Sequence, residues 1–266
     1  MATYRYTYYL LSTLGGGFGL SYLAYLAFPC RSMKFTWCAQ PGHARSLGMQ
    51  LIDPAANPTE EESYILCILA RELKSGISDE EILARFSRGF FGGWGFSPER
   101  WIAPCVQGII DHEVFTRRWQ LDAAGDSYPD TNPDTCNISH PNVMSKERLP
   151  PLGACLFGLY YLVDTNVCIS EYNYPSNARP ERSFVEYAGR TRGRSLAASH
   201  RFEIFRQFSG PTLGDQEQVM IIYSHVRSNP RNGGQVYSRP MTAMHVCYAH
   251  LLFADGIREV LASKCP

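Results

Sequence analysis

The 266-residue sequence lacks the short motifs that identify the commonest enzyme classes. It has no Gly-x-Ser-x-Gly elbow, no phosphate loop and no His-Glu-x-x-His helix, so serine hydrolase, nucleotide-dependent and zinc-protease functions are not indicated. Residues 15–20, Gly-Gly-Gly-Phe-Gly-Leu, have leucine where a dinucleotide-binding loop needs its last glycine. Function therefore has to be inferred from architecture and side-chain placement.

The sequence also lacks an excess of charge and a cysteine motif. Its 25 basic residues balance 25 acidic ones, so it has no basic footprint and no nucleic-acid partner is expected. The nine cysteines include no Cys-x-x-Cys pair, so neither a zinc ribbon nor a compact disulfide framework is indicated. We expect free buried thiols and a cytoplasmic location.

One apolar segment has no charged residue and is long enough to cross a bilayer as a helix. It begins at Tyr8 and ends at Phe28. Its glycine run and its Tyr, Ser and Thr residues lower its hydrophobicity. Two interpretations stay open: a membrane anchor, which would make the protein membrane-associated, and a packed N-terminal element, which we favour.

Helix-start signals dominate the rest of this half of the chain. Residues 59–62, Thr-Glu-Glu-Glu, and residues 78–81, Ser-Asp-Glu-Glu, are capping boxes, and each precedes an apolar stripe. They predict two helices separated by Gly76, which would form an αα-hairpin. A third helix is predicted from Ser97 toward Ile110.

A change of composition divides the chain. Residues 123–150 are rich in Pro, Asp, Asn and Ser and predict a linker or a binding loop. They separate a mostly helical region, 1–122, from an α+β ligand-pocket region, 151–266. Residues 152–163 are apolar without a clear period, and we favour a helix there.

The last 80 or so residues predict strands followed by a helix. Residues 183–188, 200–206 and 218–226 have strand patterns, and residues 241–262 have helical spacing after an N-cap serine. The predicted fold is α+β, with a helical N-terminal half and a C-terminal antiparallel sheet covered by a long C-terminal helix. Such a helix would close one side of a pocket.

Two histidines on these strands are the candidate catalytic residues. His200 and His225 lie among apolar neighbours, and imidazole exchanges protons near neutral pH. Alternatively, each is a satisfied structural group that pairs with backbone or with Glu186 or Glu203. The candidate substrate-binding residues are polar side chains able to bind a substrate oxygen: Arg206, Tyr187, Tyr223, Tyr248 and His245.

No cofactor and no metal are predicted. His245 and His250 are five residues apart on the predicted helix and cannot share a face, which argues against a helical metal pair. A site assembled from histidines distant in the sequence stays open as the minor alternative.

The order of three segments and a terminal helix carries a resemblance. Residues 184–189, Phe-Val-Glu-Tyr-Ala-Gly, are followed by residues 198–203, Ala-Ser-His-Arg-Phe-Glu, and by the strand at 219–224. This part resembles uncharacterised proteins found with fungal secondary-metabolite genes, and it is distantly similar to helix-grip proteins, whose cavities hold hydrophobic ligands. The resemblance implies an apolar natural-product ligand, and it transfers no catalytic residue by motif.

These observations predict a cofactor-independent tailoring enzyme. We expect a cyclase, isomerase or dehydratase, the last a lyase, that acts on a hydrophobic polyketide-like or terpenoid-like molecule by histidine acid/base chemistry. One alternative is a carrier or binding protein for such a ligand without chemistry. Another is a structural protein anchored by its N-terminal segment.

Overall fold

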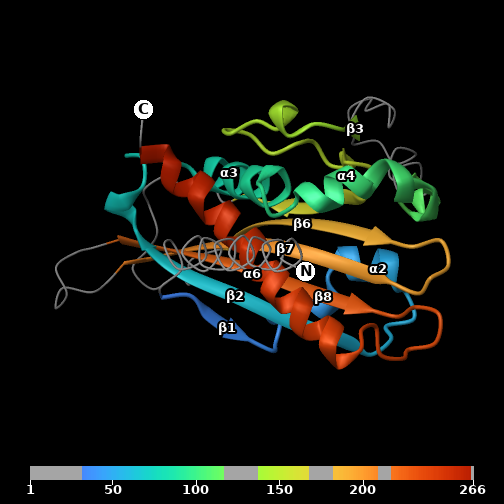
Figure 1. Cartoon of the computed structure of the whole chain (residues 1–266). Helices are drawn as coiled ribbons and strands as arrows, with labels where there is room; N and C mark the ends of the chain where they lie inside the picture. Colours follow the sequence, from blue (N-terminus) through green and yellow to red (C-terminus); the bar gives the residue numbers. More distant parts are fainter. Residues whose placement is uncertain (1–31, 117–136, 168–181, 209–216, 265–266) are drawn as a thin grey trace, which may run out of the picture.

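The computed structural model describes residues 32–116, 137–167, 182–208 and 217–264, and they form an α+β structure around one eight-stranded sheet (Figure 1). The strand order is β1-β2-β8-β7-β6-β5-β4-β3, antiparallel throughout except for the short pair β3 and β4. The strands are β1 (Lys34–Thr36), β2 (Thr59–Leu69), β3 (Asn137–Ile138), β4 (Cys155–Leu156), β5 (Tyr160–Asn166), β6 (Ser183–Arg190), β7 (Ala197–Phe208) and β8 (Glu217–Ser228).

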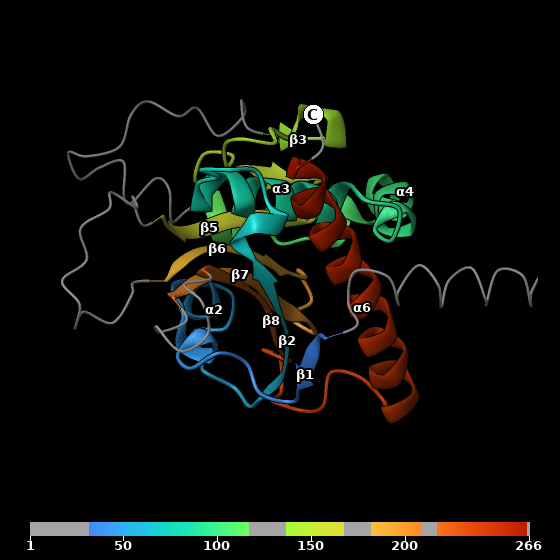
Figure 2. The same cartoon turned by 90° about the vertical axis from the view of Figure 1, so that its left-hand side faces the viewer.

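Helices cover both faces of this sheet (Figure 2). On one face α3 and α6 pack against each other and against the central strands, and on the other face lies the short α2. The α-helices are α2 (Leu47–Ile52), α3 (Asp79–Gly92), α4 (Ser97–Val106) and α6 (Arg239–Leu261). The short 3-10 turns are η1 (His43–Arg45), η2 (Ala70–Glu72), η3 (Gln107–Ile109), η5 (Pro141–Val143) and η6 (Ala262–Lys264).

Aromatic rings fill the layer between the sheet and α3. Phe90 of α3 lies with its ring centroid 4.9 Å from Phe202 of β7 and 4.9 Å from Tyr223 of β8. Gly256 lets α6 approach closely, because a Cβ there would lie 2.6 Å from an atom of the Phe86 ring. This part of the layer is occupied by side chains, so a ligand has to approach elsewhere.

Several elements confirm the sequence predictions. Ser78 caps α3, since its Oγ accepts a hydrogen bond from the backbone N–H of Glu81. The third helix begins at Ser97 as α4, and the predicted C-terminal strands and helix are β6, β7, β8 and α6. An antiparallel sheet with a long C-terminal helix across it is therefore the architecture of this protein.

The helix predicted from the first capping box is wrong, because Thr59 begins strand β2 rather than a helix. The strand pairs with β8 over its full length, from Thr59 opposite Ser228 to Leu69 opposite Gln218. This long ladder outweighs the local preference of Thr-Glu-Glu-Glu for a helix start. The predicted αα-hairpin is consequently wrong as well.

The helix favoured at residues 152–163 is also wrong, because the segment forms β4, a tight turn and the start of β5. Phe157 and Gly158 adopt positive φ angles of 54° and 70° at the turn, which a right-handed helix does not accommodate. The helical N-terminal half is not confirmed either, since residues 32–116 contribute β1 and β2 besides their helices.

Four further predictions concern the N-terminal apolar segment, the linker, the division of the chain into regions, and the cysteines. The segment at residues 8–28 and the linker residues 123–136 lie outside the described residues, and no described helix is long and apolar enough to span a membrane. Strands from regions 1–122 and 151–266 share the one sheet. The described cysteines are not generally buried, contrary to the expectation: four are exposed, and Cys155 is buried.

Candidate functional site

A row of ionisable and polar side chains crosses the sheet from strand to strand. Glu62 of β2 lies directly opposite His225 of β8, His225 lies opposite His200 of β7, and His200 lies opposite Tyr187 of β6. Directly paired residues of an antiparallel sheet point to the same face. The two predicted catalytic histidines are therefore neighbours, with ring centroids 4.5 Å apart and nearly parallel planes.

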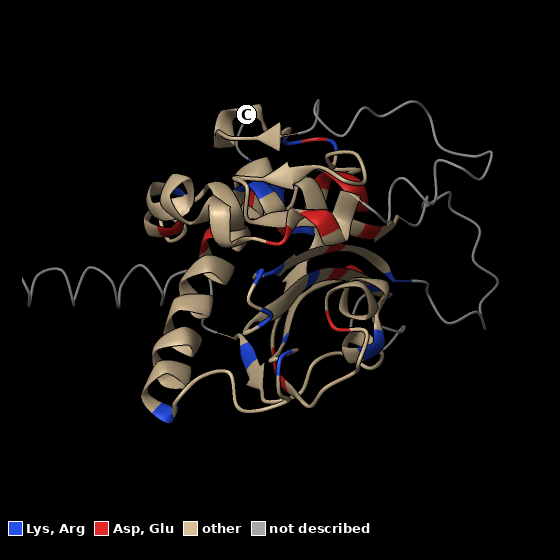
Figure 3. Ribbon diagram, turned by 90° about the vertical axis from the view of Figure 1, so that its right-hand side faces the viewer, with Lys and Arg blue, Asp and Glu red and all other residues tan. Residues whose placement is uncertain are grey.

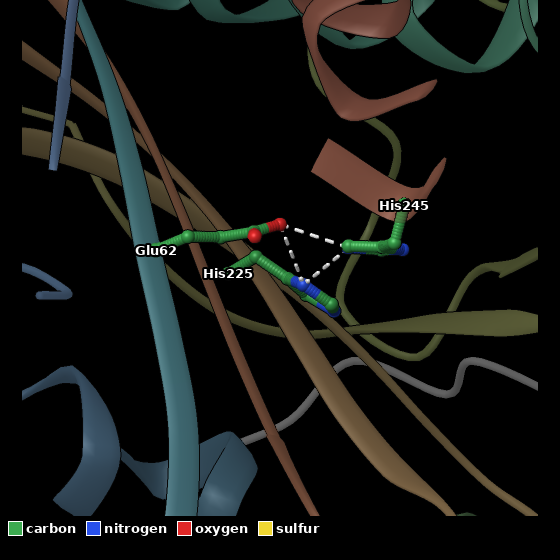
Figure 4. A group of neighbouring side chains, drawn as sticks. All are labelled: Glu62, His225 and His245. Carbon is green, nitrogen blue, oxygen red and sulfur yellow. Dashed lines mark hydrogen bonds and ion pairs between the residues drawn. The ribbon is translucent and has the colours of Figure 1, made fainter. Parts of the chain in front are cut away.

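Helix α6 adds a third imidazole above this row (Figure 4). His245 Nε2 lies 2.8 Å from Glu62 Oε1 and 3.1 Å from His225 Nδ1, while His225 Nδ1 lies 3.3 Å from the same Glu62 oxygen. The side chain of Glu62 is fully buried, whereas that of His245 is 17% exposed. We call Glu62, His225 and His245 the β2–β8–α6 cluster, and its open side is the side of His245.

Burial and the contacts within the cluster shift the pKa values of Glu62 and His225 in opposite directions. Burial raises the pKa of the Glu62 carboxyl, but the hydrogen bonds from His225 and His245 outweigh it and hold that pKa well below its usual range. Burial lowers the pKa of His225 to about 4, against the raising effect of Glu62. Glu62 is thus a carboxylate, and His225 carries no positive charge at neutral pH.

His200 stands beside the cluster with one nitrogen held and one unpaired. Its Nδ1 lies 2.9 Å from the Tyr223 hydroxyl, and its buried Nε2 has no hydrogen-bond partner among the described residues. Tyr160 of β5 stands edge-on to the same ring at 4.8 Å. Burial raises the pKa of both tyrosines well above the usual value, so their hydroxyls stay protonated and can donate.

A buried arginine completes the polar end of the sheet. Arg227 of β8 donates from Nε to Glu60 Oε2 at 2.9 Å, and its Nη1 lies 3.3 Å from His225 Nδ1. Its guanidinium also lies over the Tyr237 ring, 4.9 Å from the centroid. Arg227 therefore pairs at short range with Glu60, and at 3.7 Å it faces Glu62 Oε2, the carboxylate oxygen outside the cluster.

The remaining predicted site residues lie in other surroundings. Arg206 is six residues along β7 from His200, about 20 Å in an extended strand, and it pairs with Asp79 at 2.6 Å and Glu217 at 2.8 Å. The buried Tyr187 belongs to the row but packs its ring against Phe91 of α3. The structure brings neither Arg206 nor the Tyr187 hydroxyl to the cluster.

Tyr248 lies one turn along α6 from His245, with Glu99 of α4 as its neighbour. Burial raises the pKa of the Glu99 carboxyl to about 7, and the Tyr248 hydroxyl lowers it only in part. From Pro240 to Ala254, α6 has no Lys, Arg, Asp or Glu (Figure 3). The open side of the cluster thus lies beside an uncharged stretch of helix.

Sequence reasoning missed Glu62 and Arg227. The capping-box pattern places Glu62 at a helix start, but the alternation of Tyr64, Leu66 and Ile68 after it is the period of a strand with one buried face. Arg227 continues the face of Tyr223 and His225 by the same two-residue period, which places it on the same face of β8 as His225.

The β2–β8–α6 cluster has the donor set of a metal centre as well as that of a proton relay. Two imidazoles and one carboxylate are common ligands of zinc and of non-haem iron. The same groups can hold or move protons. Searches against protein-family models, curated proteins and solved structures found no significant match for the chain, so what this site does is argued from its own geometry.

Proposed function

We propose that this protein is an enzyme that rearranges or dehydrates a small, mainly apolar molecule, a cyclase, isomerase or dehydratase of polyketide-like or terpenoid-like compounds. One observation supports this proposal above all: Glu62, His225 and His245, from three separate elements, converge within 3.3 Å of one another at the edge of an aromatic layer. Burial of a carboxylate beside two imidazoles is costly for stability, and such groups cluster at functional sites.

The proposed chemistry divides the residues by role. The β2–β8–α6 cluster binds and polarises a substrate oxygen, since it is the part that opens toward the exposed side of α6. His200 accepts and returns a proton at Nε2, because Tyr223 occupies its other nitrogen. Tyr160, which stands edge-on to His200, donates a hydrogen bond to a developing oxyanion.

The proposed substrate is hydrophobic because of what surrounds the open side. Met241 and Met244 of α6 are exposed there, and the helix carries no formal charge between Arg239 and Asp255. Methionine side chains adapt to ligands of irregular shape. A neutral, ring-forming substrate suits these neighbours better than a phosphorylated or zwitterionic one.

The second candidate is a carrier that binds such a molecule without changing it. The uncharged stretch of α6 and the aromatic layer favour this function as much as they favour an enzyme. The cluster distinguishes the two, since a carrier has no use for Glu62. If Glu62→Gln changes no metabolite while the ligand still binds, the carrier is the better description.

The proposed function is tested by untargeted metabolite comparison of cells with the gene, without it, and with Glu62→Gln. We expect loss of a product in the second and third, together with accumulation of a precursor that is either an isomer of the product or heavier by one water. Glu61→Gln is the matched control, because Glu61 is the adjacent glutamate on the opposite face of β2 and should preserve the product. Unchanged metabolites after deletion of the gene would refute the proposal.

A further inference from the structure

The protons available to the β2–β8–α6 cluster do not fit its contacts. Arg227 can only donate, so its contact with His225 Nδ1 requires a lone pair there. With that lone pair, His225 Nδ1 and Glu62 Oε1 face each other at 3.3 Å as two acceptors. If His225 Nδ1 carries a proton instead, that proton faces the N–H donor of Arg227. It also faces the Nε2–H of His245 whenever His245 donates to Glu62.

With Glu62 ionised, every arrangement of the imidazole protons leaves at least one close contact between two donors or two acceptors, once the Arg227 contact is included. Unfavourable polar contacts at a buried position are expensive, and they indicate a missing partner. A cation accounts for the close approach of Glu62, His225 and His245 to one another, because it is bound by one lone pair from each of the three groups at once. The contacts of Glu62, His225 and His245 then become the edges of a coordination polyhedron.

The distances agree with such a polyhedron. Bonds of about 2.1 Å place neighbouring ligand atoms about 3.0 Å apart around an octahedral ion and about 3.4 Å apart around a tetrahedral one. The three candidate ligand atoms, Glu62 Oε1, His225 Nδ1 and His245 Nε2, lie 2.8, 3.1 and 3.3 Å apart. The imidazole rings of His225 and His245 are not stacked as a pair: their centroids are 4.8 Å apart and their planes are tilted by 31°.

The charges around the cluster also suit a cation. Glu62 supplies one negative charge. Arg227 pairs with Glu60 at 2.9 Å, and it lies 3.7 Å from Glu62 Oε2, the carboxylate oxygen outside the cluster. The other rings that face the cluster, His200, Tyr223 and Tyr237, bring neither a carboxylate nor a guanidinium to it. A divalent ion therefore meets two imidazoles and Oε1 of Glu62, the carboxylate oxygen that does not face Arg227.

We infer that Glu62 Oε1, His225 Nδ1 and His245 Nε2 bind one divalent first-row transition metal ion, zinc or iron(II), with its remaining positions open on the side of His245. Three protein ligands with an open position are typical of catalytic rather than structural metal sites. The binding site stands on the geometry alone. Its use as a Lewis acid on the substrate oxygen rests on the proposed function.

The test uses full-length protein stripped with a chelator and then titrated with Zn²⁺, and separately with Co²⁺ as a spectroscopic probe. We expect one ion per chain at micromolar concentration or below, and visible cobalt absorption bands from mixed nitrogen and oxygen ligands. His245→Ala should weaken zinc binding by at least about 100-fold, since loss of a ligand exceeds the effect of losing an outer-shell partner. The matched control is His250→Ala on the same helix, which bonds the Val246 carbonyl instead and should keep wild-type affinity.

The result that overturns the inference is wild-type protein that retains no zinc or cobalt at micromolar concentration, or equal weakening by His245→Ala and His250→Ala. His245 is partly exposed on a helix, so its truncation should leave the fold intact, and an unchanged far-UV circular dichroism spectrum checks this. The two proposals fail separately. A metabolite conversion that persists in chelator removes the metal and keeps the enzyme, whereas tight zinc binding without any conversion keeps the site and removes the reaction.

Discussion

Two fully buried glutamates, Glu62 and Glu186, lie on opposite faces of the same sheet and differ in the polar groups that contact their carboxylates. Glu186 faces α2, where its Oε1 accepts hydrogen bonds from the hydroxyls of Ser46 at 2.6 Å and Ser199 at 2.7 Å. Glu62 faces α6, where its closest neighbours are the imidazoles of His225 and His245.

Around Glu186 the hydroxyl protons of Ser46 and Ser199 each have an acceptor. The neutral His43 donates from Nε2 to Ser199 Oγ at 2.9 Å, and the Ser199 hydroxyl donates a hydrogen bond to Glu186 Oε1. Burial raises the pKa of the Glu186 carboxyl, and the hydroxyl bonds only partly oppose it. This network of hydroxyls fixes α2 against the sheet, although Glu186 Oε2 and His43 Nδ1 have no hydrogen-bond partner among the described residues.

Around Glu62 the pKa moves the other way and the protons do not fit. Burial is again the largest effect on the carboxyl, yet the imidazole contacts outweigh it and the pKa falls. The difference teaches that burial of a carboxylate does not identify a site. What distinguishes the two faces is that hydroxyl protons bind Glu186 Oε1, whereas Glu62 Oε1 and the two imidazole nitrogens next to it lie in mutual contact.

The largest expected effect concerns zinc. A hundredfold excess of Zn²⁺ over its dissociation constant should stabilise the wild-type fold by about 2.7 kcal/mol, a rise in melting temperature of several degrees. Glu62→Gln should abolish this rise because an amide oxygen is a poor replacement for the carboxylate, whereas Glu186→Gln should retain it. Thermal unfolding with and without zinc measures both, and an equal response of the two variants would erase the contrast between the faces.

A smaller effect is expected on the α2 face. Ser199→Ala removes the hydroxyl between His43 and Glu186 and leaves both without that partner, which should lower the free energy of unfolding by about 1–3 kcal/mol. Urea unfolding measures this loss, and the zinc response should stay that of the wild type. The exposed Ser195→Ala serves as control, and equal midpoints for the two variants would mean that the network contributes nothing to stability.

The smallest effect concerns a third carboxyl, Glu99, which has neither imidazoles nor several hydroxyls around it. Its pKa of about 7 in the fold exceeds the ordinary 4.5, so the folded state favours the protonated form and loses stability as pH rises from about 4.5 to 7. Glu99→Gln should therefore stabilise the protein by about 1–2 kcal/mol near pH 8, and not at all near pH 4.

Melting temperatures across this pH range provide the measurement for Glu99. The exposed Glu147→Gln should change little at either end of the range. A Glu99→Gln gain that is independent of pH would show that the benefit comes from packing rather than from removal of a buried charge.

Elements whose signals are local can be predicted from the amino-acid sequence. The capping serine and apolar stripe of α3, the long α6, and the two-residue alternation of β7 and β8 were all readable, because a period of 3.6 or 2 needs no distant partner. The alternation also placed His200 and His225 on strand faces, which made them candidates before their contacts were known.

Three features depend on tertiary contacts: His200 and His225 are neighbours, Glu62 belongs to a strand, and His245 of α6 contacts both Glu62 and His225. A two-residue period assigns a face to a strand but does not set its register, which depends on pairing between residues far apart in the chain, such as Glu62 with His225. The helix-start pattern at Thr59 lost to that pairing. The site itself exists because of contacts between residues about 20 to 180 positions apart.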